Sequence, residues 1–253
     1  MLEVKEVEKS FGGLAAVSDC SLNVEEGSIT GLIGPNGAGK TTLFNVITGY
    51  YKPDKGRIIF QGQGIEGLLP HQIFQKKIYR TFQITREFAQ MTVLENVMLM
   101  PDQQIGERIW NTWFRPGLVR SQEKVIQEKA LDVLEFVELI DLKDEYAGSL
   151  SGGQKKLLEL ARSMMAEPKM VLLDEPGSGV NPTLMKKLMA NIRKLCEEKK
   201  ITFFLIEHDM ELVMDLCNPV IVMSEGKKLA EGTPEEIKKD EKVLEAYLGG
   251  QYR

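Results

Sequence analysis

The residues with the clearest chemical potential form a run of glycine, lysine and threonine at 34–42, which reads GPNGAGKTT. The run fits the pattern G-x-x-x-x-G-K-[ST], follows the apolar stretch Ile29–Ile33 and opens a predicted helix near Lys40. Small residues let successive backbone N–H groups converge on phosphate oxygens, and a helix N-terminus adds positive potential. A glycine-rich turn is the plain alternative, but the pattern in this context favours binding of nucleotide phosphates.

Within this loop each residue type has its own expected role. Lys40 should reach the β- and γ-phosphates of a bound nucleotide, and the Thr41 hydroxyl should bind Mg²⁺. The residues expected to line the nucleotide phosphates are Gly34, Asn36, Gly37, Ala38, Gly39, Lys40, Thr41 and Thr42.

A second candidate site is the sequence MVLLDE at 170–175, an apolar stretch that ends in two carboxylates. Ligands of open α/β sheets bind beyond the carboxyl ends of the strands. Asp174 is therefore expected to help hold Mg²⁺, and Glu175 to orient or deprotonate an attacking water. Taken alone, the stretch is more simply a buried strand that surfaces into a charged turn. A phosphate-binding loop on the same sheet favours the metal site instead.

The sequence LSGGQ at 150–154 comes directly before a helical stretch. Ser-Gly-Gly alone is an ordinary N-capping turn. In a chain that already has a phosphate-binding loop, a second glycine-rich helix start predicts a second phosphate site, formed by Ser151, Gly152, Gly153 and Gln154. Two such half-sites in one chain indicate a head-to-tail dimer that holds nucleotide between the two copies.

The elements that would position these residues change character along the chain. Strand-like stretches are predicted at Leu2–Val7, Ser28–Ile33 and Arg57–Phe60, separated by glycine and proline turns. The middle of the chain has helical spacing at 121–139 and 151–165.

After Pro168 the pattern becomes strand, helix, strand, at 170–174, 182–198 and 201–207. Near-continuous apolar strands that alternate with helices predict a parallel sheet covered on both faces. The sequence therefore indicates an α/β core, at 1–83 and 166–253, interrupted by a helical subdomain at 84–165.

Composition limits the classes of protein that the sequence can encode. The chain has 253 residues, of which 43% are hydrophobic and 27% charged, as in a soluble globular protein. No apolar run approaches the ~20 residues that cross a bilayer, and the N-terminus alternates like a strand, unlike a signal peptide. The formal net charge of −5 argues against a nucleic-acid partner. Three scattered cysteines indicate reduced thiols.

The motifs, in this order, resemble the ABC ATPase family over nearly the whole chain. GPNGAGKTT resembles its Walker A loop, LSGGQ its signature, and MVLLDE its Walker B strand. The resemblance implies a P-loop NTPase core with a mixed, mainly parallel sheet, and ATP and Mg²⁺ as cofactors. It also implies that Gln83 senses Mg²⁺ and water, that His208 contacts the γ-phosphate, and that Phe11 stacks on adenine. Asn181 departs from the family pattern, which usually has aspartate there.

Each of these smaller assignments has an alternative. Phe11 could be ordinary core packing, and Gln83 could merely end an edge strand. His208 could be a satisfied histidine, or a metal ligand with its neighbours Glu207 and Asp209. Adjacent residues of a strand point to opposite faces, which argues against such a metal trio.

One branch of the family is a closer match. The segment YRTFQITREFAQMTVLENVML, with Arg86 and Phe88, resembles the ATPase subunits of branched-chain amino acid importers, as do EGTPEEI and EAYLG near the end of the chain. Amide and urea importers lie nearby. The implied protein is a peripheral subunit on the cytoplasmic side of the membrane. Its implied partners are a second cassette, identical or related, two permease subunits and, indirectly, an extracytoplasmic solute-binding protein.

Proteins of other classes fit the sequence less well. A non-transport ABC protein of DNA repair would usually have a long coiled coil, and one of translation would usually have two cassettes. A module without turnover would lack Glu175 or His208, and a small-molecule kinase would not explain LSGGQ. Residues 101–120 remain open, because Trp110 and Trp113 could contact a partner or a membrane, or pack on neighbouring helices.

Overall fold

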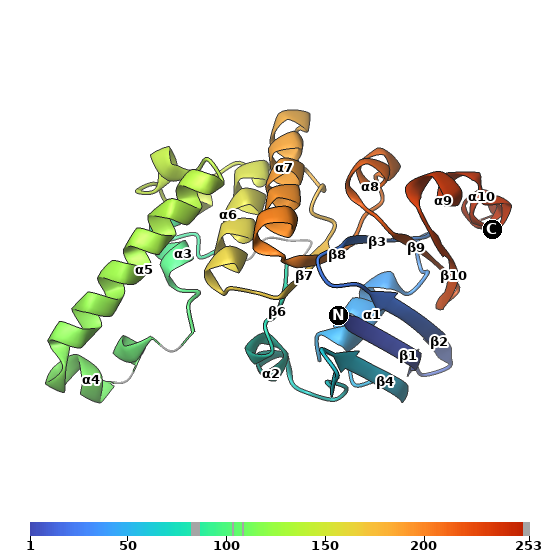
Figure 1. Cartoon of the computed structure of the whole chain (residues 1–253), viewed down its shortest axis with the longest axis horizontal. Coiled ribbons are helices and arrows are strands. Elements are labelled where there is room, and N and C mark those ends of the chain that lie inside the picture. Colours follow the sequence, from blue (N-terminus) through green and yellow to red (C-terminus); the bar gives the residue numbers. More distant parts are fainter. Residues whose placement is uncertain (82–86, 103, 108, 250–253) are drawn as a thin grey trace. The chain divides into compact units, whose positions relative to one another are not determined.

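The computed structural model describes residues 1–81, 87–102, 104–107 and 109–249 of the chain (Figure 1). The chain divides into two compact units. The first comprises Met1–Gln83, Lys169–Ser178 and Ile192–Arg253, and the second comprises Ile84–Pro168 and Gly179–Asn191. The division expected from sequence, at 83 and 166, differs from these units mainly in the segment 179–191, and it remains a prediction of functional subdomains.

The first unit contains two sheets. One has four strands in the order β2-β1-β4-β5, all antiparallel, and the other has six in the order β10-β9-β3-β8-β7-β6. The strands are β1 Leu2–Phe11, β2 Leu14–Val24, β3 Ile29–Ile33, β4 Lys55–Phe60, β5 Gln63–Gly64, β6 Ile78–Arg80, β7 Met170–Asp174, β8 Thr202–Ile206, β9 Val220–Ser224 and β10 Lys227–Gly232.

In the six-stranded sheet every pair is parallel except β9 with β10. All five residues of β7 and of β8 are buried, which explains why both read as unbroken apolar runs. The expected α/β fold with a mixed, mainly parallel sheet is therefore confirmed.

The helices of the first unit are mostly short (Figure 1). They are α1 Lys40–Ile47, α2 Pro70–Gln75, α8 Met210–Leu216, α9 Pro234–Lys239 and α10 Glu241–Gly249. Buried side chains of α1 join those of both sheets in one core, where the rings of Phe44 and Phe204 lie 5.0 Å apart. This core fixes α1, and with it the loop before it, against the parallel sheet.

The described part of the second unit is helical. Its helices are α3 Val93–Met98, α4 Ile109–Phe114, α5 Pro116–Phe136 and α6 Gly152–Met165, with short 3₁₀ turns at Ile105–Glu107, Ile140–Leu142 and Ala147–Ser149. Helix α7, Pro182–Lys199, begins in this unit and ends in the first. Helix α5 begins five residues before the predicted start at 121, because Pro116 suits the first turn of a helix and Val119 is already buried.

Candidate nucleotide site

Three adjacent parallel strands bring the predicted phosphate-binding and catalytic residues of the first unit to one edge of the sheet. β3 pairs with β8, and β8 pairs with β7. The phosphate-binding loop follows β3, His208 follows β8, Asp174 ends β7 and Glu175 comes directly after it. The residues thus lie at the carboxyl ends of these strands, where open α/β sheets bind their ligands.

Backbone geometry explains two glycines of the loop. Gly34 has φ 148°, and a Cβ there would lie 2.0 Å from the carbonyl oxygen of Met223. Gly39 has φ 94°, caps α1, and would place a Cβ 2.2 Å from the carbonyl oxygen of Ala16. Gly39 has no side chain and therefore cannot cap the first N–H groups of α1. These N–H groups remain available to bind an anion.

Lys40 lies inside this loop and is almost fully buried. Its Nζ donates to the carbonyl oxygens of Gly34, at 2.7 Å, and Pro35, at 3.1 Å. Burial lowers the pKa of Lys40, while the carboxylates of Glu175 and Asp174 act in the opposite direction. The cation is thus held at the loop and within electrostatic reach of both carboxylates.

The Asp174 carboxylate forms a buried ion pair that the sequence did not predict. Arg80, the last residue of β6, donates from Nη2 to Oδ2 of Asp174 at 2.8 Å, and the two side chains are only 6% and 7% exposed. Nη1 of Arg80 donates to Asn45 and Thr48 on α1 and beyond its end. The sequence shows only an arginine at the end of an apolar stretch. That this arginine meets Asp174 depends on the pairing register of β6 with β7, which the sequence does not reveal.

Glu175 and His208 are in direct contact. Oε1 of Glu175 and Nε2 of His208 share a hydrogen bond of 2.8 Å, so Nε2 carries the proton when Glu175 is ionised. Glu175 has a left-handed backbone, φ 50°, and its N–H donates to Ile206 of β8 at 3.0 Å.

Glu207, beside His208, is a second residue that the sequence analysis did not assign to the site. Its buried carboxylate accepts from the N–H of Gly177 at 2.6 Å and from that of His208 at 3.0 Å. Burial raises the pKa of Glu207, and these backbone hydrogen bonds oppose the rise. No group of His, Cys, Asp or Glu within the described ranges could hold a metal on its own, which excludes the trio of Glu207, His208 and Asp209 there.

The ring of Phe11 is not part of the core. It ends β1, is nearly half exposed, and meets Tyr51 edge to face with ring centroids 5.0 Å apart. Nζ of Lys9 lies 5.5 Å from the ring centroid. The alternative of ordinary core packing for Phe11 is therefore wrong.

Tyr247, on α10, lies near the phosphate-binding loop. Burial raises the pKa of its phenol, and the nearby backbone N–H of Gly34 acts in the opposite direction. The sequence EAYLG drew attention to this segment only through its resemblance, because proximity between residues over two hundred positions apart has no local signal.

The predicted half-site at LSGGQ lies in the second unit. Ser151 caps α6, and its hydroxyl accepts from the N–H of Gln154 at 3.4 Å, while Oε1 of Gln154 accepts from the N–H of Ser151 at 2.9 Å. A Cβ on Gly153 would lie 2.5 Å from Cδ1 and 3.1 Å from Cβ of Leu184, so α6 packs closely against the start of α7 here. Local capping and packing thus explain this sequence before any ligand is considered.

Comparisons with known proteins agree with these features. A family model described as "ABC transporter" matches residues 17–178, and one described as "Branched-chain amino acid ATP-binding cassette transporter" matches residues 227–253. The chain is 43% identical over 249 residues to the high-affinity branched-chain amino acid transport ATP-binding protein BraF of Pseudomonas aeruginosa, and the match covers 98% of each chain. The chain belongs to the ABC transporter family.

Solved structures support the same assignment. The ADP conformation of the cassette MJ1267 aligns with a TM-score of 0.82 and 37% identity over 98% of each chain. The dimeric structure of the cassette MJ0796 aligns with a TM-score of 0.76 and 25% identity, over 92% of this chain and 99% of that one. The predicted ATPase activity follows from the family: this cassette is the ATP-binding, ATP-hydrolysing subunit of a transporter, and such subunits dimerise and work with permeases.

Further predictions bear on the contacts of the cassette with other subunits. Gln83 and Arg86 lie outside the described residues. None of the helices described in the structure is long and apolar enough to cross a membrane.

Asn181, which stands where the family usually has aspartate, still caps the following helix. Its Oδ1 accepts from the N–H of Leu184 at 3.0 Å in the first turn of α7.

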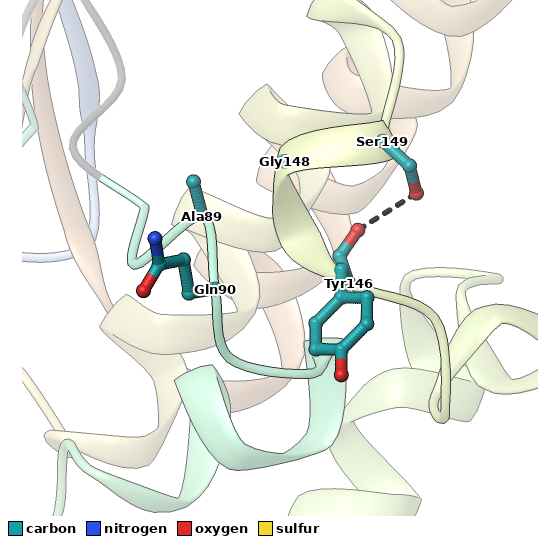
Figure 2. A pocket seen from close by; sticks show the side chains of 5 residues that line it. All are labelled: Ala89, Gln90, Tyr146, Gly148 and Ser149. Carbon is teal, nitrogen blue, oxygen red and sulfur yellow. Dashed lines mark hydrogen bonds between the residues drawn. The ribbon is translucent and has the colours of Figure 1, made fainter.

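A shallow pocket of about 560 Å³ opens on the second unit (Figure 2). Figure 2 shows Ala89 and Gln90 on one segment that lines the pocket and Tyr146 on another. The hydroxyl of Ser149 donates to the carbonyl oxygen of Tyr146 at 2.7 Å. The neighbouring Phe88 is exposed, and the guanidinium of Arg162 lies 5.5 Å from its ring centroid. Phe88 is therefore not a core residue of this unit.

Proposed function

We propose that this cassette energises the import of branched-chain amino acids by hydrolysing ATP on the cytoplasmic side of the membrane. The observation that carries this proposal is the match to a branched-chain amino acid transport ATP-binding protein over 98% of both chains, together with the match of residues 227–253 to a model of that branch. The terminal segment matters because Tyr247 within it lies near the first glycine of the phosphate-binding loop.

ATP would bind between Phe11 and the loop. The partly exposed Phe11 ring would stack on adenine, and the loop N–H groups at 34–42 would hold the phosphates. Lys40 would exchange its two carbonyl acceptors for β- and γ-phosphate oxygens, which are stronger acceptors for a buried cation.

The residues present fit Mg²⁺, although no single cluster of side chains forms a complete metal site in the described chain. The Thr41 hydroxyl, the buried Asp174 carboxylate and the Gln83 side chain offer only oxygen and amide donors, and Mg²⁺ prefers oxygen and usually keeps waters and phosphate oxygens as its other ligands. Bound Mg²⁺ would neutralise charge on the β- and γ-phosphates.

Hydrolysis would depend on the Glu175–His208 pair. Glu175 would orient the attacking water and accept its proton. The 2.8 Å hydrogen bond holds both side chains at the edge of the sheet where the γ-phosphate would lie. When His208 turns to the γ-phosphate, it releases Glu175 toward the water. Gln83, between β6 and the second unit, would report the occupied site.

The half-site Ser151, Gly152, Gly153 and Gln154 would act on the nucleotide of a second cassette, identical or related. Its glycines and the exposed N-terminus of α6 suit a phosphate, and the dimer of MJ0796 is the related precedent. Permease subunits would bind the exposed surface at Phe88 and the pocket beside it. An extracytoplasmic binding protein would deliver the solute to the permeases. We propose no nucleic-acid partner.

The test is uptake by the complex purified through a tag on this chain and reconstituted in proteoliposomes with its binding protein. ATP-dependent accumulation of leucine, isoleucine and valine should exceed that of urea or short amides. Transport of urea or amides in place of the amino acids would overturn the choice of solute and leave the ATPase assignment intact.

A further inference from the structure

An exposed aromatic cluster on the second unit is not used by the proposed mechanism. We call Trp110, Trp113, Phe114 and Leu118 the aromatic patch. Trp110, Trp113 and Phe114 are 72%, 81% and 70% exposed, and Leu118 is also exposed. The residues of the patch belong to α4 and the first turn of α5, the two helices labelled α4 and α5 in Figure 1. Contiguous exposed apolar surface of this kind marks an interaction site.

The outward position of these rings is set by the fold. Residues 110, 113 and 114 have the spacing of one face of α4, and such a face ordinarily packs inward. Here the polar side chain of Asn111 faces inward instead and donates to the carbonyl oxygen of Ile105 at 3.0 Å. The N–H of Ile105 in turn donates to Gln122 on α5 at 2.6 Å. The rings of Trp110 and Phe114 stack with centroids 5.9 Å apart.

The sequence segment that carries the patch is basic, unlike the chain as a whole. The sequence 108–120, RIWNTWFRPGLVR, contains three arginines and no aspartate or glutamate, whereas the chain has a net charge of −5. Arg115 and Arg120, within this segment, are both exposed. Tryptophan with arginine is the combination that lies at a membrane interface, where rings enter the headgroup layer and cations pair with lipid phosphates.

We propose that the aromatic patch, with Arg115 and Arg120, binds the anionic lipid surface of the membrane next to the permease. The inference rests on the proposed function insofar as a transporter subunit works beside a bilayer. It adds a second attachment that needs neither permease nor nucleotide. The contact is interfacial, because only side chains of a short helix and the start of another reach the lipid.

The chain supplies its own reporter, since its two tryptophans, Trp110 and Trp113, both belong to the patch. The full chain is mixed with vesicles of phosphatidylcholine alone, or of equal parts phosphatidylcholine and phosphatidylglycerol, with no permease present. On the anionic vesicles, tryptophan emission should move to shorter wavelength and the protein should sediment with the lipid. Molar salt should weaken both signals.

A charge variant keeps both reporters and tests the arginines. In Arg115→Gln/Arg120→Gln, partition onto anionic vesicles should fall about fivefold for each charge removed, so about 25-fold in total. The matched control is Arg57→Gln/Lys239→Gln, which removes two exposed positive charges from the first unit and should bind like the unchanged protein. ATPase activity of the isolated cassette should be the same in all three proteins.

Several outcomes would overturn the proposal. An emission spectrum that does not change on anionic vesicles refutes it, as does equal loss of binding in the control variant. A shift that follows protein concentration without lipid assigns the patch to a second copy of the chain. A shift that needs the purified permease assigns it to that subunit. Solute uptake is measured separately, so failure of lipid binding is distinguishable from failure of the proposed import function.

Discussion

The buried Arg80–Asp174 pair gives the sharpest test of how the site is held. Arg80→Met removes the cation and leaves the Asp174 carboxylate uncompensated in a place where both side chains are less than a tenth exposed. Breaking a buried pair in this way costs about 3–5 kcal/mol of the free energy of unfolding. With a urea m-value of about 3 kcal/mol per molar, the unfolding midpoint should fall by roughly 1 M or more.

The matched control is the pair Arg193–Asp215, which lies in the same unit at nearly the same distance, 2.9 Å. Its side chains are 41% and 62% exposed. Since exposed pairs contribute about 0–1 kcal/mol, Arg193→Met should shift the midpoint only slightly. The double variant Arg80→Met/Asp174→Leu should recover much of the loss, because an apolar pair leaves no buried charge. Equal midpoints for Arg80→Met and Arg193→Met would refute the argument from burial.

Four other variants test the proposed roles. Lys40→Ala should weaken ATP binding about tenfold to hundredfold in calorimetry while the fold is kept, since a charge-assisted contact is lost; unchanged affinity would remove the loop from the site. Glu175→Gln should keep ATP affinity, lower turnover about 10²–10⁴-fold, and dimerise with ATP but not ADP by light scattering. Ser151→Arg should bind ATP normally yet lose hydrolysis, whereas retained turnover at low protein concentration would place a complete site in one chain. Phe88→Ala should leave ATPase activity of the isolated cassette nearly unchanged and abolish co-purification of the permeases; parallel loss of both would make Phe88 structural.

Features with a strong local signal could be predicted from the sequence. The loop at 34–42, the strand Met170–Asp174 and the helix after LSGGQ combine short motifs with clear periodicity, and the structure has all three elements. Strand β2, Leu14–Val24, was not predicted, because serine, aspartate and asparagine interrupt its apolar pattern. Its place is decided by antiparallel pairing with β1, which a local window cannot detect.

Contacts distant in sequence could not be predicted. Arg80 meets Asp174 because β6 and β7 pair in one register, and Glu207 caps Gly177 because β7 and β8 end together. A shift of one residue in either pairing would turn these side chains to the opposite face. The two tryptophans are a similar case, because their spacing in the sequence suits packing on neighbouring helices equally well. Only the structure shows that both are exposed.

The same contacts suggest how hydrolysis could act on the second unit. The chain passes between the two units after β6, immediately before β7, after Ser178 and within α7. The first three crossings lie next to the two strands that Arg80 ties together through Asp174. Glu207 fixes the segment that leads to the third crossing, through Gly177, and also holds the backbone of His208. A movement of His208 on loss of the γ-phosphate would therefore act directly on a segment that enters the second unit, and no longer path through the core is required.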